Sequence, residues 1–144
     1  MFDVKDKVVI ITGSSRGIGK AIAFQLAKSG AKVDISSRKK EVCEKVATEF
    51  QDSGLNAISI PCHVGEKGQI SNLVSKTYEA FGSLDTIVCN AATNPAYGKL
   101  SELDDLAFNK LMQVNVQSTI WLTNLALPFF SNSKGGSIIF LSSI

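Results

Sequence analysis

The sequence is poor in the residues that build metal centres and disulfide frameworks. Its 144 residues include 3 cysteines and 1 histidine. Cys43, Cys62 and Cys89 lie far apart, and only His63 could join them at a metal ion. An odd number of widely spaced cysteines also does not indicate a disulfide framework. We therefore expect reduced cysteines that mainly pack in the interior, and no metal site.

An excess of one charge and long apolar runs are also absent. The formal net charge is +2, and the basic residues are dispersed apart from a short cluster at residues 38–40. This composition predicts neither a nucleic-acid partner nor a membrane partner. Thr123, Asn124 and Pro128 interrupt the longest apolar candidate for a membrane span, and the first residues lack the core of a signal peptide. These absences predict a soluble, cytoplasmic protein.

Glycine is concentrated in one segment, which reads T-G-S-S-R-G-I-G from Thr12 to Gly19. The apolar run before it, residues 8–11, predicts a buried strand, and the four-residue spacing of Ile18, Ile22 and Leu26 predicts a helix after it. The free N–H groups and the dipole of a helix start bind phosphate, and glycines let a pyrophosphate approach the backbone. We therefore predict a dinucleotide site. The alternative is that the glycines serve only a tight turn and close helix packing.

Strand-like runs alternate with amphipathic helical patterns along the chain. Strands are expected near residues 7–12, 32–37, 56–61, 84–90 and 136–142, with helices between most of them, including 39–52 and 66–81. Gly30 has the position of a helix C-cap. The alternation predicts an α/β fold with a Rossmann-like, doubly wound parallel sheet and helices on both faces. Ligands of such sheets bind beyond the carboxyl ends of the strands.

The end of the sequence is unusual for a domain. The last apolar run, residues 138–141, is followed only by Ser142, Ser143 and Ile144. The segment 103–130 is apolar on nearly all sides, more than five strands require. We expect one NAD(P)-binding domain over residues 1–144, truncated after the fifth strand, with missing chain or a partner covering the apolar excess.

Several motifs at matching distances resemble the short-chain dehydrogenase/reductase family over essentially the whole chain. The glycine segment is similar to the family's TGxxxGxG cofactor loop, and C-N-A-A at residues 89–92 is similar to its NNAG segment. V-N-V at residues 114–116 resembles the Asn element of the family's long helix, and Ser142-Ser143 resembles the serine pair that ends the fifth strand. Within the family, residues 62–65 and 90–95 look like the branch of NADPH-dependent carbonyl reductases and NADP-retinol dehydrogenases.

The resemblance implies an oxidoreductase that transfers hydride between NADP(H) and a carbonyl or alcohol substrate, such as a ketone, an aldehyde or a retinoid. Asn115 would hold a water of the proton relay, and Ser143 would hydrogen-bond the substrate oxygen. The alternatives are a solvent-facing helical Asn and an ordinary strand-end Ser. The family's YxxxK motif does not occur in these 144 residues. We therefore expect this chain by itself to be inactive. Because the apolar excess of residues 103–130 suggests an interface, we also expect the full-length form to be a homo-oligomer.

The expected cofactor-binding residues come from the glycine segment, from the ends of the second and third strands, and from the motif after the fourth. They are Gly13, Ser14, Ser15, Arg16, Gly17, Ile18, Gly19, Ser37, Arg38, His63, Val64, Asn90, Ala91 and Ala92. By the resemblance, His63 stands where most relatives carry an adenine-binding Asp, and it could equally be a strand-end His beside solvent. Ala92 replaces the glycine of NNAG.

The end of the second predicted strand favours NADP over NAD. An NAD site places a carboxylate there to accept from the ribose 2′-OH, whereas an NADP site needs cations. Arg38 and Arg16 are placed to converge on a 2′-phosphate, with the Ser37 hydroxyl as a further donor. Asp34 favours the NAD alternative, but it lies inside the strand.

Two other functions stay open at this point: a 3-oxoacyl reductase of fatty-acid synthesis, and a non-catalytic dinucleotide-binding module. A YxxxK motif following Ser143 would favour an enzyme. Neither the substrate nor a C-terminal peroxisomal address can be read from these residues.

Overall fold

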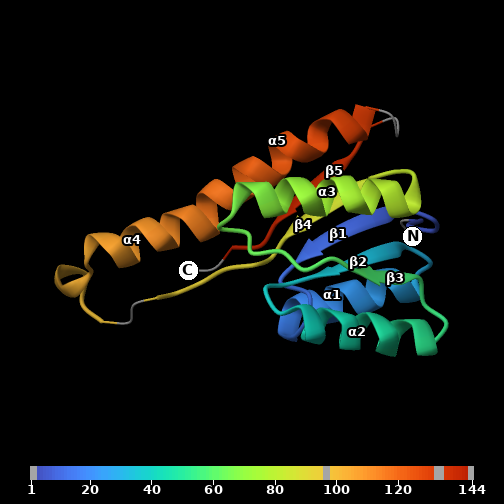
Figure 1. Ribbon diagram of the computed structural model, residues 1–144, viewed down its shortest axis with the longest axis horizontal. Helices are drawn as coiled ribbons and strands as arrows, with labels where there is room; N and C mark the ends of the chain where they lie inside the picture. Colours follow the sequence, from blue (N-terminus) through green and yellow to red (C-terminus); the bar gives the residue numbers. More distant parts are fainter. Residues whose placement is uncertain (1–2, 96–97, 132–134, 143–144) are drawn as a thin grey trace.

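A five-stranded parallel sheet forms the centre of the molecule (Figure 1). The computed structural model describes residues 3–95, 98–131 and 135–142. Its strands are β1 (Val8–Thr12), β2 (Lys32–Ser36), β3 (Ala57–Ser59), β4 (Thr86–Cys89) and β5 (Ser137–Phe140), in the order β3-β2-β1-β4-β5. Each strand lies within its predicted range. The order confirms the doubly wound sheet, because the chain leaves β1 toward β3 and then returns to add β4 and β5 on the other side.

Helices cover both faces of the sheet, as right-handed crossovers require (Figure 1). They are α1 (Gly17–Lys28), α2 (Lys40–Asp52), α3 (Lys67–Phe81), α4 (Asp105–Met112) and α5 (Ser118–Ser131), with a 3₁₀ turn η1 (Leu100–Glu102) and a π-helical segment η2 (Gln113–Gln117). α1 and α2 lie on one face, and α3 and α5 on the other. α4 extends beyond the sheet.

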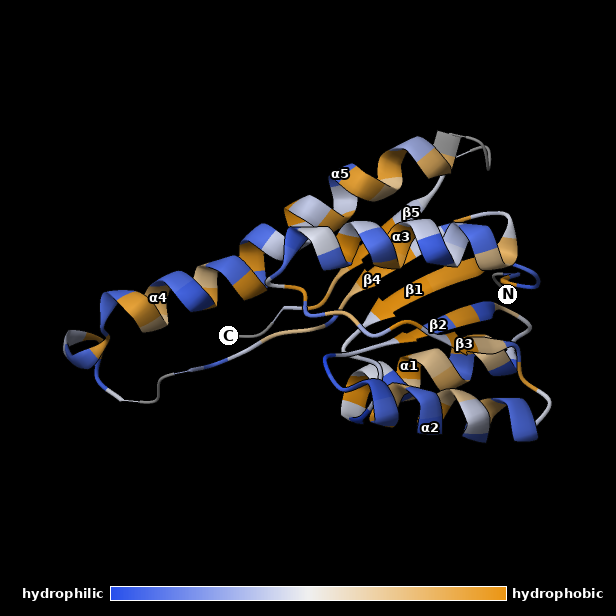
Figure 2. Cartoon of the chain, in the orientation of Figure 1, coloured by the Kyte–Doolittle hydropathy of each residue, from blue (hydrophilic) through white to orange (hydrophobic). Residues whose placement is uncertain are grey.

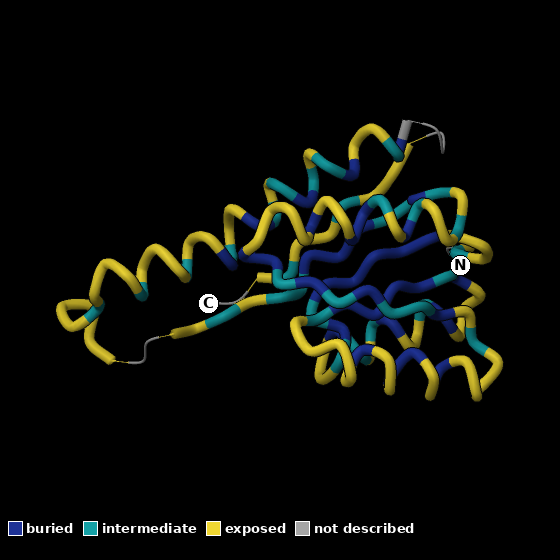
Figure 3. Tube along the Cα trace, viewed as in Figure 1, coloured by how far each residue is buried: buried dark blue, intermediate teal, exposed yellow. Residues whose placement is uncertain are grey.

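Alternation along the strands divides the core into two layers. Val8 and Ile10 of β1 pack toward α3 and α5, whereas Val9 and Ile11 pack toward α1 and α2. β1 is hydrophobic and buried on both faces, as Figures 2 and 3 show. A strand of this kind reads as a continuous apolar run, which is why it was recognisable in the sequence.

The buried face of α1 consists of small residues. Ile18 is 67% exposed, and the buried positions are Gly19, Ala23 and Ala27. Small side chains allow the helix axis to lie close to β1 and β2, so the larger Ile22 and Leu26 pack only partly against the core. The helix ends where Gly30 was expected to cap it: Ser29 is the C-cap, and Gly30 follows with φ +92°.

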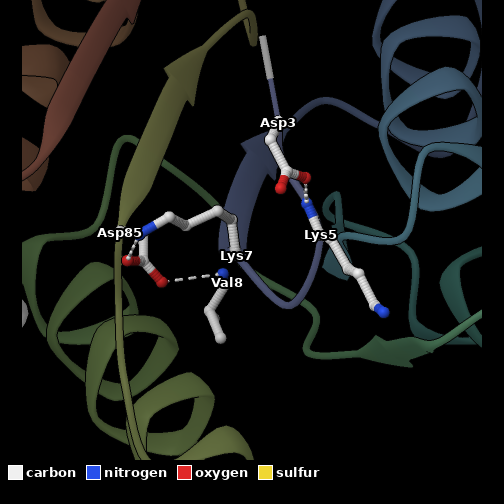
Figure 4. A network of polar contacts seen from close by, with 5 residues as sticks. All are labelled: Asp3, Lys5, Lys7, Val8 and Asp85. Carbon is white, nitrogen blue, oxygen red and sulfur yellow. Dashed lines mark hydrogen bonds and ion pairs between the residues drawn. The ribbon is translucent and has the colours of Figure 1, made fainter.

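A carboxylate joins the starts of β1 and β4. Asp85 accepts hydrogen bonds from Lys7 Nζ at 2.9 Å and from the Val8 N–H at 2.9 Å (Figure 4). Asp3 accepts from the Lys5 N–H at 2.9 Å in the preceding turn. These contacts lie at the amino ends of the strands, opposite the carboxyl ends where a ligand is expected to bind.

The apolar excess of residues 103–130 is visible as exposed surface. The π-helical segment divides the predicted long helix, and Phe108, Met112, Val116 and Ile120 recur at four-residue spacing as exposed side chains. Phe140 of β5 is also more than half exposed. The three cysteines are free and buried, as expected.

Candidate functional site

A cavity of about 730 Å³ opens at the carboxyl ends of the strands, where the order of the sheet reverses between β1 and β4. All of the cofactor-binding residues expected from the sequence line it except Ser14. It is also lined by residues that sequence reasoning missed: Lys39, Val42, Cys62, Thr93, Lys110 and Val114. Lys39 belongs to the basic cluster already noticed. Cys62, Thr93 and Val114 belong to segments that carried the family resemblance, whereas Val42 of α2 and Lys110 of α4 have no local sequence signal.

Two glycines allow the loop after β1 to lie against the end of β4. Gly13 has φ +70°, and a Cβ there would lie 2.9 Å from Asn90 Nδ2 and 3.0 Å from Ala91 Cα. A Cβ on Gly19 would overlap Gly13 O and lie 2.5 Å from Asn90 Nδ2. The packing role that the sequence left as an alternative is therefore real at these two positions. Gly17, with φ +55° and open space around it, faces no such crowding.

Thr12 and Asn90 hold the same two segments together by hydrogen bonds. Thr12 Oγ1 accepts from the N–H groups of Asn90 and Ala91, each at 3.1 Å. Asn90 Nδ2 donates to Thr12 O at 2.9 Å and to Gly13 O at 3.2 Å. The first turn of α1, which starts from this loop, carries no acidic side chain. Its N-terminus is therefore electrostatically suited to an anion.

Two exposed arginines line the cavity. Arg16 comes from the glycine loop and Arg38 from the turn after β2, and both line the cavity. Within the described ranges, no carboxylate forms an ion pair with either arginine. The Ser37 hydroxyl lies 3.1 Å from Cys43 Sγ, so its role as a further donor competes with this contact.

Asp34 does not contribute to the cavity. Its side chain is fully buried on the α3 side of the sheet, where it accepts from Thr77 Oγ1 at 2.6 Å and from the Ile60 N–H at 3.1 Å. Burial raises its pKa to about 7, although both hydrogen bonds act to lower it. The only acid that the sequence offered for an NAD ribose is therefore turned away from the end of β2.

His63 lies half-buried at the edge of the cavity, and its ring is already oriented. Nδ1 accepts from the Gly65 N–H at 2.9 Å, so a neutral ring carries its proton on Nε2. The neighbouring Cys62 also lines the cavity. Burial, and secondarily the charge of Asp34, raise the pKa of its thiol to about 12. Cys62 is thus a neutral thiol at physiological pH and not a nucleophile.

Asn115 lies within the π-helical segment and is paired with the loop after β4. Its Oδ1 accepts from the Thr93 N–H at 2.8 Å, and its Nδ2 donates to Thr93 O at 2.8 Å. It is therefore not a solvent-facing helical Asn. One amide hydrogen and one lone pair stay available for a further partner. Ser143, the other expected catalytic residue, lies outside the described residues, and the preceding Ser142 is exposed.

The described ranges contain no group of three or more His, Cys, Asp or Glu side chains that could hold a metal ion. None of the helices in these ranges is long and apolar enough to cross a membrane.

Known proteins share both the sequence pattern and the fold. The family model for short chain dehydrogenases matches residues 7–144. The chain is 36% identical over 141 residues to dehydrogenase/reductase SDR family member 4 of Sus scrofa, covering 98% of this chain and 50% of that protein. It is 37% identical over 138 residues to tropinone reductase-like 3 of Erythroxylum coca, covering 96% and 54%. The chain thus spans about half the length of the curated relatives it matches.

Solved structures of related oxidoreductases share the fold of this chain. A metagenomic short-chain oxidoreductase in complex with NADP superposes with a TM-score of 0.91 at 30% identity, over 99% of this chain and 65% of that chain. A hydroxysteroid dehydrogenase from Escherichia coli gives a TM-score of 0.90 at 28% identity, over 97% and 57%.

Proposed function

This chain belongs to the short-chain dehydrogenase family, and we propose that it is the dinucleotide-binding part of an NADP(H)-dependent oxidoreductase. One observation carries the choice of NADP: Arg16 and Arg38 come from separate segments and line the same cavity, with no carboxylate of the described residues paired to either. The burial of Asp34 removes the main argument for NAD. The solved relative that holds NADP is consistent with this choice.

The residues of this chain bind and orient the cofactor, which supplies the hydride when bound. The N-terminus of α1 and the glycine loop would receive the pyrophosphate, and the two arginines would receive the 2′-phosphate. Asn90 and Thr12 keep the loop and the end of β4 in register. His63 and Val64, which follow β3 and line the cavity, would contact the adenine.

The proposed reaction is hydride transfer between NADP(H) and a carbonyl or alcohol group of a ketone, aldehyde or retinoid-like substrate. Hydride addition leaves a negative oxygen, which the hydroxyl of Ser143 would stabilise and which a general acid must protonate. Asn115 retains one amide hydrogen and one lone pair with which to hold a water of the proton relay. The names of the relatives, a tropinone reductase-like protein and a hydroxysteroid dehydrogenase, support this substrate class.

Titration of the purified protein with NADPH and with NADH, followed by fluorescence, tests the proposal. Two charge-assisted hydrogen bonds of about 1.5 to 3 kcal/mol each favour NADPH by roughly two to four orders of magnitude in affinity. Arg38→Asp should reverse the preference. Lys40→Asp is the matched control, because Lys40 bears the same charge two residues away but does not line the cavity and pairs with Glu44 at 3.6 Å. Equal affinities for the two cofactors in the unmutated protein would contradict the proposal.

A further inference from the structure

Ser14 is the one expected cofactor-binding residue that does not reach the cavity. Its side chain is fully buried between the glycine loop and the end of β2. Ser14 Oγ donates to Ile11 O at 2.6 Å and accepts from the Ser36 N–H at 2.8 Å, while the Ser14 N–H donates to Ser36 O at 3.0 Å. Because the hydroxyl proton is directed to Ile11 O, a lone pair of the oxygen faces the Ser36 N–H.

These bonds continue the pairing of β1 with β2 beyond the end of β1. The regular register ends with Thr12 opposite Ser36, and Gly13 then turns the backbone with φ +70°. Past that turn, the Ser14 side chain takes the place that a main-chain carbonyl would have in a longer strand. Both main-chain groups of Ser36 are therefore satisfied by the loop residue Ser14.

The hydrogen bonds between Ser14 and Ser36, here called the tie, join the two segments that carry the arginines. Arg16 lies two residues after Ser14, and Arg38 lies two residues after Ser36. The exposed guanidinium groups make no ion pair with any described carboxylate, so their separation depends on the backbones from which they project. The hydrogen bonds of Ser14 to Ser36 fix these two backbones relative to each other.

We propose that Ser14 is a positioning residue for cofactor selectivity, which keeps Arg16 and Arg38 at the separation that a 2′-phosphate bridges. This inference rests on the proposed NADP(H) function. The glycine loop and α1 would hold the pyrophosphate from one side of the tie, whereas a 2′-phosphate would be held by Arg16 and Arg38, one from each side. Loss of the tie should therefore affect NADPH more than NADH, which lacks that phosphate.

The test compares Ser14→Ala with Ser36→Ala in the purified protein. Ser36 Oγ is buried and makes no hydrogen bond within the described part of the chain, so Ser36→Ala removes a buried hydroxyl from the same place without removing the tie. Dissociation constants for NADPH and NADH are measured for each variant, with circular dichroism and thermal melting as controls for folding. Ser14→Ala should reduce the NADPH preference about tenfold, as expected for weakening one charge-assisted hydrogen bond. Ser36→Ala should keep the preference of the unmutated protein.

The outcomes separate this inference from the function on which it rests. If the unmutated protein does not prefer NADPH, both are overturned. If it prefers NADPH and Ser14→Ala keeps the same ratio, or loses both affinities equally, only the positioning role is overturned. Should Ser14→Ala fail to fold, Ser14→Cys, whose thiol is a weaker donor and acceptor, should show an intermediate ratio; an unchanged ratio would equally overturn the role.

Discussion

Replacing Asp34 by asparagine is expected to change how the stability of this protein depends on pH. Burial raises the pKa of Asp34 from 3.8 to about 7 in the folded protein. Because the folded pKa lies above the unfolded one, the folded state holds the proton more tightly, and the resulting stabilisation is complete below about pH 4 and lost as the pH rises through 7. The gap corresponds to about 4 kcal/mol, a large part of the 5 to 15 kcal/mol typical of a domain.

The hydrogen bonds around Asp34 suit the neutral acid. Thr77 Oγ1 lies 2.6 Å from Asp34 Oδ2 and 2.8 Å from Leu73 O, and its hydroxyl has only one proton to give. When Asp34 is protonated, it can donate to Thr77, which then donates to Leu73 O, so every group is satisfied. When Asp34 is ionised, a fully buried charge has only the Thr77 hydroxyl and the Ile60 N–H to replace water.

Urea denaturation of the unmutated protein and of Asp34→Asn between pH 4 and pH 8.5 measures this effect. Asparagine keeps a donor for Thr77 and an acceptor for Ile60 but does not titrate. The other acids and bases titrate in both proteins, so the difference in unfolding free energy isolates Asp34. Asp34→Asn should gain about 4 kcal/mol relative to the unmutated protein across this range. Parallel pH profiles would refute the reasoning.

Three further predictions concern the cofactor loop and catalysis. Gly19→Ala should cost about 1 to 3 kcal/mol in thermal unfolding because its Cβ overlaps Gly13 O, whereas Gly68→Ala, in open space on α3, should not. Thr12→Val should weaken NADPH binding and stability, since the N–H groups of Asn90 and Ala91 lose their acceptor. Residues 1–144 alone should oxidise no NADPH with a ketone, aldehyde and retinoid panel, because a missing general acid costs about 10² to 10⁴ in rate; turnover equal to that of a longer protein containing YxxxK would contradict this.

Hydrophobic periodicity by itself predicted the elements and the class of fold. Buried parallel strands leave continuous apolar runs, and the helix predicted over residues 66–81 is α3, whose buried residues are Ile70, Leu73, Val74 and Thr77. The glycine segment predicted the strand-to-helix junction, since few other residues adopt its backbone conformations. These signals are local, because each depends on residues within one or two turns of the chain.

Other features depended on contacts between residues far apart in the sequence. The spacing of Ile18, Ile22 and Leu26 predicted the helix α1 but not its packing on the sheet, because this spacing carries no information on how closely a helix must approach. In the sequence, Asp34 was the acid that could accept from the ribose of NAD. In the structure, its carboxyl group is buried and hydrogen-bonded to Thr77, 43 residues away. Likewise, the sequence placed Ser14 among the ligand-binding residues, whereas its hydrogen bonds to Ser36 exist only because parallel pairing brings β2 beside β1. The sequence states the chemistry of each side chain, but the packing of distant segments determines which groups that side chain contacts.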